Sequence, residues 1–318
     1  MTRPPLQPET LDIDMLREMY REGAVTLAGV DPRLNATRIA RKIRVRRARV
    51  AGRLKAWTDS GFLRRYDVWV NPALFGWKGA GLNIRVLHPR AKAELFSRLA
   101  VLEGAVWGVE FLGEWITFSV ITPDAAALER TRRLISGLVG VREVDVPLPW
   151  RVLPPMRELS PLDIRIVRAL RQNPTAMLST TADRVGISTR TMTRRYANLV
   201  ENRDVWFVPV FDFRALSYPV VALGMTLRAE TDRNSILRRI RTRYPLSLAF
   251  GEMPGPGPEA GGLLCLVMPP SAAHLEEVEG YVASIEGVEE LEANVVVRLH
   301  SFPDWFDRQL EALARRPS

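Results

Sequence analysis

A dense run of basic side chains lies between residues 38 and 55 of this 318-residue chain. It holds nine arginine or lysine residues and no acidic residue. Arg46, Arg49 and Arg53 recur at positions i, i+3 and i+7, which places them on one face of a helix. Guanidinium groups bind phosphate oxygens and the edge of guanine, so such a helix has the chemistry to enter the major groove of DNA. A solvated surface helix is the plainer interpretation of the same run.

The residue types that commonly carry catalysis form no comparable pattern. His88, His274 and His300 are scattered at the ends of predicted elements, and Cys265 lies inside an apolar run typical of a buried strand. The acidic residues between 276 and 292 indicate a solvated face rather than a metal site. We therefore predict no catalytic residues, no metal and no cofactor, and we expect that the protein is not an enzyme.

The elements around the basic run must position it. Val50, Leu54 and Trp57 give the basic helix an apolar stripe, and Gly61 ends it. A short helix over 37–43 precedes it, and residues 62–70 alternate as an exposed hairpin would. Helix, turn, basic helix and hairpin are the layout of a winged helix-turn-helix, whose second helix enters the major groove.

That layout assigns a role to each basic side chain. We expect the basic helix to face the groove and the neighbouring elements to contact phosphates. The predicted groove residues are Arg46, Arg47, Arg49 and Arg53. The predicted phosphate contacts are Arg38, Arg41 and Lys42 on the preceding helix, and Arg64 and Arg65 on the wing.

A different pattern begins at residue 79. Strands are predicted over 80–87, 105–112, 115–121 and 141–148, and helices over 90–102 and 123–138. The order βαββαβ is the ferredoxin-like motif.

The same order of predicted elements then occurs a second time in the chain. Residues 182, 192, 196 and 199 fall 142 positions after residues 40, 50, 54 and 57 of the first helix-turn-helix. A second βαββαβ pattern and an amphipathic C-terminal helix follow. The second unit has four basic residues over 180–197, where the first has nine, and its predicted DNA-binding residues are Ser188, Arg190, Thr191, Arg194 and Arg195.

The predicted fold class is therefore α+β, a tandem repeat of a winged helix-turn-helix plus a ferredoxin-like βαββαβ domain for ligand binding or oligomerisation. The expected boundaries are 1–78 for the first winged helix-turn-helix, 79–150 for the first ferredoxin-like domain, 151–158 for a Pro-rich linker, 159–218 for the second winged helix-turn-helix, 219–300 for the second ferredoxin-like domain and 301–318 for the C-terminal helix.

Charge alternates along these blocks. Residues 1–78 carry 16 basic and 8 acidic residues, and residues 151–218 carry 11 and 6. Residues 79–150 are balanced, and residues 219–318 carry 10 basic and 14 acidic residues. The positive blocks coincide with the two predicted DNA-binding units. With no leader-like segment and no long apolar run, we expect a cytoplasmic protein without membrane contact.

The aspartate-led first helix, the helix-turn-helix, the wing over 60–77 and the βαββαβ pattern together resemble the Lrp/AsnC family of transcriptional regulators. The chain resembles two such proteins fused head to tail. This resemblance implies a sequence-specific regulator that binds double-stranded DNA and assembles through its βαββαβ domains. It implies a homo-oligomer, and we favour a dimer of chains over pairing within one chain alone.

The family's effector site suggests a weak candidate at Gly113 and Glu114, with a small molecule such as an amino acid as ligand. Arg44 departs from the repeat, because Gly186 occupies the equivalent turn position in the second copy. We therefore expect the first turn to differ in shape. Two alternatives stay open: a sirohaem-decarboxylase-like enzyme on the same fold, and a partner of other regulators that serves assembly only.

Overall fold

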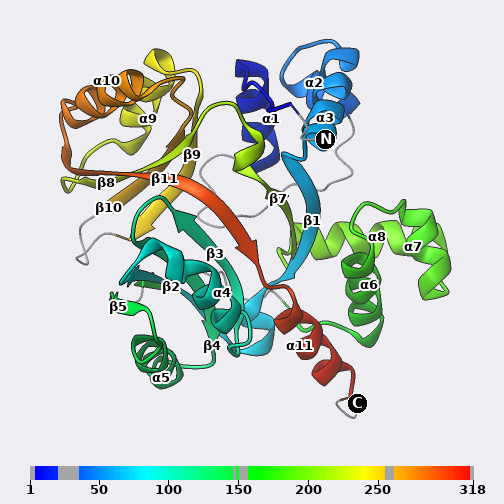
Figure 1. Cartoon of the computed structure of the whole chain (residues 1–318). Coiled ribbons are helices and arrows are strands. Elements are labelled where there is room, and N and C mark those ends of the chain that lie inside the picture. The colour runs from blue at the N-terminus through cyan, green and yellow to red at the C-terminus, as the bar shows by residue number, and fades with distance from the viewer. Residues whose placement is uncertain (1–3, 21–35, 146–147, 150–156, 255–260, 316–318) are drawn as a thin grey trace.

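A computed structural model describes residues 4–20, 36–145, 148–149, 157–254 and 261–315. Residues 21–35, before the first helix-turn-helix, lie outside these residues, as does most of the predicted linker over 151–158. The described elements form two winged units and one large sheet, arranged as Figure 1 shows. The predicted α+β fold class is confirmed.

The first winged unit begins with a helix that the sequence places after a lead of nine residues. Its elements are α1 (Thr10–Tyr20), α2 (Ala36–Lys42), α3 (Arg47–Ser60) and β1 (Leu63–Val70). Gly61 adopts φ 80° and ends α3, as its freedom in the left-handed region predicts. Before α1, Leu6 is buried and its amide donates to the Ala215 carbonyl at 2.7 Å.

The turn between α2 and α3 corrects one expectation. Arg44 adopts φ 58°, in the same left-handed region as Gly186 at φ 76°. The first turn therefore has the same backbone conformation as the second. Arg44 carries the strain that a side chain has in the left-handed region, and the turn does not change its shape to avoid it.

The second winged unit repeats the first. Its elements are α6 (Pro161–Gln172), α7 (Leu178–Val185), α8 (Thr189–Glu201) and β7 (Val205–Phe211). Ser160 caps α6 through a reciprocal pair of hydrogen bonds with Asp163.

The wings are not hairpins, which corrects the prediction for residues 62–70. Each winged unit supplies one strand, and β1 and β7 pair antiparallel with Tyr66 opposite Pro209 and Trp69 opposite Trp206. Most of β1 is buried. Because the strands run in opposite directions, α3 leads into one end of this ribbon and α8 into the other (Figure 1). The ribbon therefore fixes the separation of the two helix-turn-helix motifs.

Both βαββαβ units form as the sequence patterns indicate. The first comprises β2 (Lys78–Val86), α4 (Lys92–Leu99), β3 (Ala105–Phe111), β4 (Trp115–Thr122), α5 (Ala125–Ser136), β5 (Val141–Val144) and the short β6 (Leu148–Pro149). The second comprises β8 (Val220–Leu227), α9 (Arg233–Arg243), β9 (Ser247–Pro254), β10 (Gly261–Val267), α10 (Ala272–Ala283) and β11 (Val288–Ser301).

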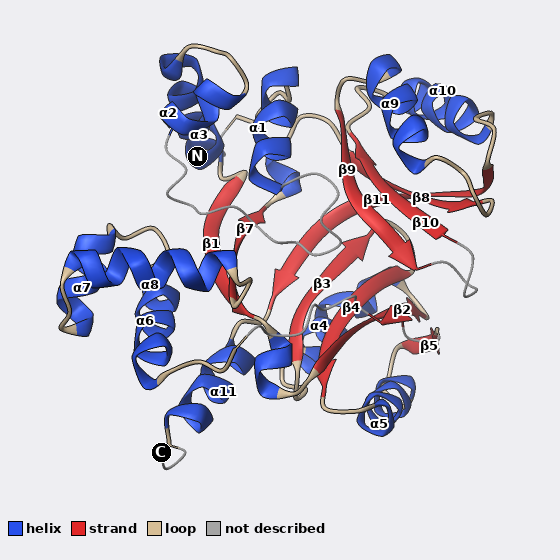
Figure 2. Ribbon diagram, turned by 180° about the vertical axis from the view of Figure 1, so that it is seen from behind, coloured by secondary structure: helices blue, strands red, loops and turns tan. Residues whose placement is uncertain are grey.

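The two units join edge to edge within the chain. β3 pairs antiparallel with β11, with Val109 opposite Leu299, and this pairing closes a nine-stranded sheet in the order β5-β2-β4-β3-β11-β8-β10-β9, with β6 against β2. Figure 2 shows the strands running through both units. The long β11 reaches this seam because it extends beyond the strand needed to complete its own unit.

The hydrophobic cores cross between the halves. Trp57 and Phe62 of the first winged unit share a core with Phe211 of β7 and with Leu248 and Val296 of the second ferredoxin-like unit. The second winged unit packs instead against Val106, Ile121 and α11 (Asp304–Ala314), where Trp305 and Phe306 are fully buried. Neither half can therefore bury its apolar surface alone. Among the described residues, no helix combines the length and the apolar character needed to cross a bilayer.

Candidate nucleic-acid interface

The end of α2, the turn after it and the start of α3 present a cluster of exposed guanidinium groups. Arg46 has extended backbone angles and supplies no side-chain hydrogen bond to the helix it precedes. The Arg46 side chain therefore leaves the N-terminus of α3 uncapped, and a helix N-terminus favours an acceptor such as a phosphate oxygen. The exposed members of this cluster, which we call the α3 arginine cluster, are Arg41, Arg44, Arg46, Arg47 and Arg49.

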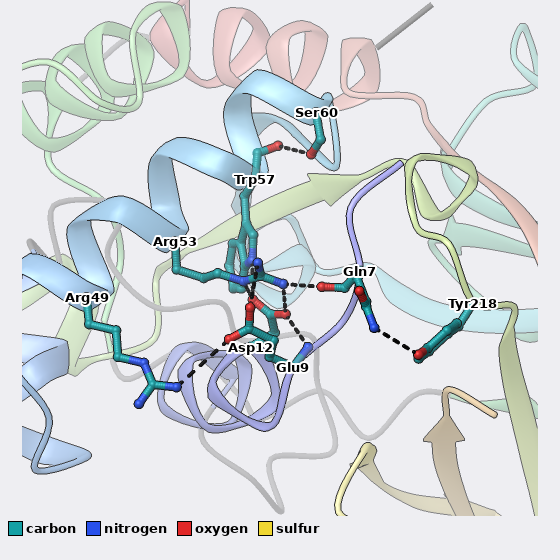
Figure 3. Close-up of polar contacts among 8 residues, drawn as sticks. All are labelled: Gln7, Glu9, Asp12, Arg49, Arg53, Trp57, Ser60 and Tyr218. Atoms are coloured by element: carbon teal, nitrogen blue, oxygen red, sulfur yellow. Dashed lines mark hydrogen bonds and ion pairs between the residues drawn. The ribbon is translucent and has the colours of Figure 1, made fainter. Parts of the chain in front are cut away.

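Arg53 does not belong to the cluster, and its prediction as a groove residue is unsupported by its position. Its Nε donates to Asp12 Oδ1 at 2.5 Å, and its side chain is only 13% exposed. Trp57 Nε1 donates to the same Asp12 oxygen at 2.6 Å. Figure 3 shows Arg53 turned toward α1, while Arg49 extends away from Trp57.

The hydrogen bond that Arg53 donates to Asp12 is the main reason that the pKa of Arg53 is raised above its ordinary value. A guanidinium that holds a buried carboxylate has lost its capacity for DNA, because the carboxylate would be left unpaired. Arg53 thus fixes α3 on α1 and positions the cluster.

The remaining basic residues of the first unit have weaker partners. Arg49 lies 3.9 Å from Glu9 and stays 64% exposed, and Lys42 pairs with Glu18 at 2.6 Å on the surface. Arg38 is exposed on α2. On β1, exposed Arg64 and Arg65 face Asp212 at 3.6 Å and Asp67 at 2.8 Å. The pairs of Lys42 and Arg49 are at the surface, where a phosphate can compete for the cation. Asp212 and Asp67 are themselves buried, so Arg64 and Arg65 also compensate buried carboxylates and are less available to a phosphate.

The second unit presents less charge. Ser188 caps α8 by accepting from the Thr191 amide at 3.2 Å, and the two hydroxyls lie 3.0 Å apart. Arg190 and Arg194 are exposed. Arg195 is drawn inward, with its Nη1 3.3 Å from Asp163 Oδ2.

Asp163 is the counterpart of Asp12 and is fully buried. It accepts hydrogen bonds from Arg157 at 2.8 Å and from the Ser160 amide at 3.1 Å. Burial by itself would raise the pKa of Asp163, but the hydrogen bonds from Arg157 and Ser160 outweigh it and hold the pKa below its usual value. In both winged units, therefore, an aspartate on the first helix holds an arginine of the third helix, α3 or α8.

Sequence reasoning missed Asp12, Asp163 and Arg157 as positioning residues. The signal was present, because an aspartate follows a leucine at the start of both first helices, at 11–12 and 162–163. An aspartate near a helix N-terminus is usually explained by the helix dipole, and the burial of Asp12 and Asp163 shows that they do more here.

At the weak effector candidate, Gly113 and Glu114, the carboxylate is already paired with basic side chains. Gly113 adopts φ 85° in the turn between β3 and β4. Glu114 accepts a hydrogen bond from Arg85 at 2.9 Å and lies 3.7 Å from Arg142. A carboxylate that already balances two guanidinium groups is a poor partner for the amine of an amino acid.

No protein-family model matches the chain, and no curated protein does. Among solved structures, the siroheme decarboxylase NirDL aligns with a TM-score of 0.55 at 14% identity, over 96% of this chain and 99% of its own. E. coli AsnC aligns with a TM-score of 0.32 at 16% identity, over 48% of this chain and 99% of its own. An AsnC family transcriptional regulator from Agrobacterium tumefaciens aligns with a TM-score of 0.30 at 19% identity, over 43% of this chain and 89% of its own.

The alignment with NirDL, which extends over nearly all of this chain, supports the fold. It also corrects the expectation that the protein is not an enzyme. NirDL, which aligns with both halves, is an enzyme, so this fold gives no ground for excluding enzymatic activity.

Proposed function

We propose that the protein is a sequence-specific DNA-binding transcriptional regulator of the Lrp/AsnC type, built as two such units in one chain. In this proposal α3 enters the major groove with the α3 arginine cluster, and α8 binds a second, less charged half-site. The ferredoxin-like units join the two halves through β3 and β11.

The observation that carries this proposal is the exposed α3 arginine cluster on a helix whose orientation is fixed from within. Arg53 and Trp57 both bond Asp12, so α3 is held while its N-terminal turn projects outward. A rigid helix with exposed cations at its N-terminal end is the arrangement by which a helix-turn-helix contacts base edges and phosphates.

The test is a salt series with duplex DNA selected from random sequence by the protein. Five phosphate contacts give a slope of log affinity against log salt of about −4.5. The triple variant Arg46→Ala, Arg47→Ala and Arg49→Ala should flatten this slope by about 2 to 3. A binding constant that does not change between low and physiological salt would overturn the proposal.

A matched control removes the same charge elsewhere. Arg98, Arg133 and Arg142 are exposed on the first ferredoxin-like unit, with 40%, 75% and 53% of their side chains accessible. Their triple alanine variant should keep the slope of the native protein. An equal loss in both triple variants would show that only net charge matters and that α3 is not the reading helix.

A second candidate function is decarboxylation of a carboxylate-bearing tetrapyrrole, and it rests on the match of NirDL to both halves of the chain. Addition of siroheme to the purified protein, followed by Soret absorbance and product mass, tests it. Stoichiometric binding with loss of carbon dioxide would establish this activity. No spectral change at micromolar protein and siroheme would reject it. The DNA-binding measurement does not depend on the outcome of this assay.

A further inference from the structure

The second ferredoxin-like unit concentrates its positive charge on one helix. Residues 219–318 hold ten basic residues, and five of them lie on α9: Arg233, Arg238, Arg239, Arg241 and Arg243. The equivalent helix of the first unit, α4, has only Lys92 and Arg98, and Lys92 is buried. The proposed DNA-binding role of α3 and α8 leaves this feature of α9 unexplained.

The spacing on α9 separates the helix into two faces. Ile236, Leu237 and Ile240 are buried against the sheet. Five other positions recur at i, i+3, i+4, i+7 and i+8, which is the spacing of one continuous helical face. They are Ser235, Arg238, Arg239, Thr242 and Arg243.

These five side chains, together with Tyr281 of α10, line an open cavity of about 490 Å³. We call it the α9–α10 groove. Its volume lies in the range of small-molecule sites, about 300 to 1,000 Å³. All six lining side chains carry a hydrogen-bond donor, and three of them carry a permanent positive charge.

One arginine of the groove is held in place by its neighbours. Arg243 Nη2 donates to Glu277 at 3.0 Å, and its Nε donates to the Tyr244 hydroxyl at 3.2 Å. Its guanidinium also lies over the ring of Tyr281, 5.0 Å from the centroid. A guanidinium fixed by an acceptor and an aromatic face loses less conformational freedom when it binds an anion.

The other two arginines, Arg238 and Arg239, are exposed, and in the described part of the chain no acidic side chain strongly neutralises them. Arg238 reaches Asp232 at 3.3 Å and remains 66% exposed. Arg239 is exposed, and among the residues that the structure describes no acidic side chain pairs with it. The groove thus combines one oriented arginine with two that can close on a ligand.

We propose that the α9–α10 groove binds a small polyanion, a molecule with two or more phosphate or carboxylate groups. Paired guanidinium groups bind such groups in a bidentate manner, and the hydroxyls of Ser235 and Thr242 add donors beside them. The acidic residues of α10, with Glu277 at the edge of the groove, repel a long polyanion such as nucleic acid. A small ligand between the arginines avoids that repulsion.

Calorimetric titration of the full-length protein tests the proposal, with inorganic pyrophosphate as the phosphate probe and citrate as the carboxylate probe. At physiological salt we expect one saturable site per chain for at least one of the two. Arg239→Gln should weaken binding about 10-fold, as expected for loss of a charge-assisted hydrogen bond, and Arg239→Gln with Arg243→Gln should remove it. The relative affinities of the two probes identify the acidic group that the groove prefers.

Arg98→Gln on α4 is the matched control, because it removes one exposed arginine from the equivalent helix outside the groove. It should leave pyrophosphate and citrate binding unchanged. The proposal would be overturned if neither probe gave saturable heat at concentrations up to about 100 mM, which is 100 times a Kd of about 1 mM. Equal affinities in the native and Arg239→Gln proteins would also overturn it.

Two further outcomes also count against it. Anion binding that disappears in the α3 triple variant would place the anion at the DNA surface. Light scattering that shows self-association dependent on Arg239, without anion binding, would assign the groove to the acidic α10 of a second copy. The groove variants should keep the DNA affinity of the native protein, so this proposal and the proposed function fail separately.

Discussion

Arg53 and Asp12 form a two-pronged ion pair that joins α3 to α1 across 41 positions of the chain. Asp12 is 3% exposed, so its charge depends on Arg53 and on the Trp57 indole for compensation. The pair fixes the angle between the two helices through a buried contact, and the residues of the α3 arginine cluster stay outside this contact.

Replacement of Arg53 by alanine should therefore reduce the stability of the folded protein, in addition to any effect on DNA binding. Loss of one partner of a buried pair leaves an uncompensated charge, so we expect a fall of about 3 to 5 kcal/mol in the free energy of unfolding. Arg49→Ala, at an exposed position, should change stability by less than about 0.5 kcal/mol. Urea unfolding of the two variants measures both values.

A double-mutant cycle with Asp12→Asn identifies the cause. If the cost of Arg53→Ala comes from the stranded carboxylate, Arg53→Ala should be much less harmful in the Asp12→Asn background. The same cost in both backgrounds would mean that Arg53 stabilises the fold by packing only.

The fold was accessible from sequence because each unit carries a local pattern. The 142-residue repeat and the order of elements predicted both winged units and both ferredoxin-like units. The pairing of β1 with β7 was not accessible, since alternation along 62–70 does not say which strand lies opposite. Tyr66 meets Pro209, a partner more than 140 positions away, instead of a second strand of its own wing.

The site was predicted only in part for a related reason. Helical spacing placed Arg46, Arg49 and Arg53 on one face, but a face seven residues long spans two turns. The first turn of α3 projects from the molecule, and the second faces α1. Only a knowledge of where Asp12 lies separates Arg53, which is tied to the core, from Arg49, which is 64% exposed.

The two winged units should bind DNA unequally. The first presents the five exposed residues of the α3 arginine cluster, while α8 presents Arg190 and Arg194. Each phosphate contact contributes to affinity and to the salt slope, so the triple variant of Arg46, Arg47 and Arg49 should lose more affinity than Arg190→Ala with Arg194→Ala. Footprinting should show two dissimilar half-sites. Equal losses with a palindromic footprint would mean that the units act as a symmetric pair.

The strained turn at Arg44 gives a prediction in which stability and binding move in opposite directions. Its φ of 58° is costly for a side chain and free for glycine, so Arg44→Gly should raise the free energy of unfolding by about 0.5 to 1 kcal/mol after the entropy of the unfolded glycine is subtracted. The same change removes one exposed guanidinium and should weaken DNA binding. Gly186→Ala, at the equivalent position with φ 76°, is the reciprocal control and should destabilise.

If Arg44→Gly destabilises the protein, the Arg44 side chain makes a stabilising contact that outweighs the strain. Thermal unfolding and DNA affinity measured on the same samples separate the two effects.

The seam between the ferredoxin-like units carries a histidine whose protonation opposes folding. His300 on β11 stacks on Phe96 with ring centroids 3.7 Å apart, and its Nε2 lies 3.4 Å from Glu110 on β3. Burial lowers the pKa of His300 below its ordinary 6.5, the Glu110 carboxylate opposes this shift, and Arg298 and Arg214 add to it. The fold therefore keeps the imidazole neutral at a pH where the unfolded chain has already taken up a proton.

The sign of the pH dependence follows from that difference. Below pH 6.5 the unfolded chain binds more protons at this position than the folded protein, so stability rises with pH through this window and is lost as pH falls. Between pH 7.5 and 5.5 the loss from this one group is at most about 1.4 kcal/mol. His300→Gln should remove that part of the slope in urea unfolding. Glu110→Gln, which removes the carboxylate that favours the proton, should leave a slope at least as steep as that of the native protein. If His300→Gln keeps the full slope, the pH sensitivity of the seam belongs to other groups, and His300 contributes through its stacking on Phe96 alone.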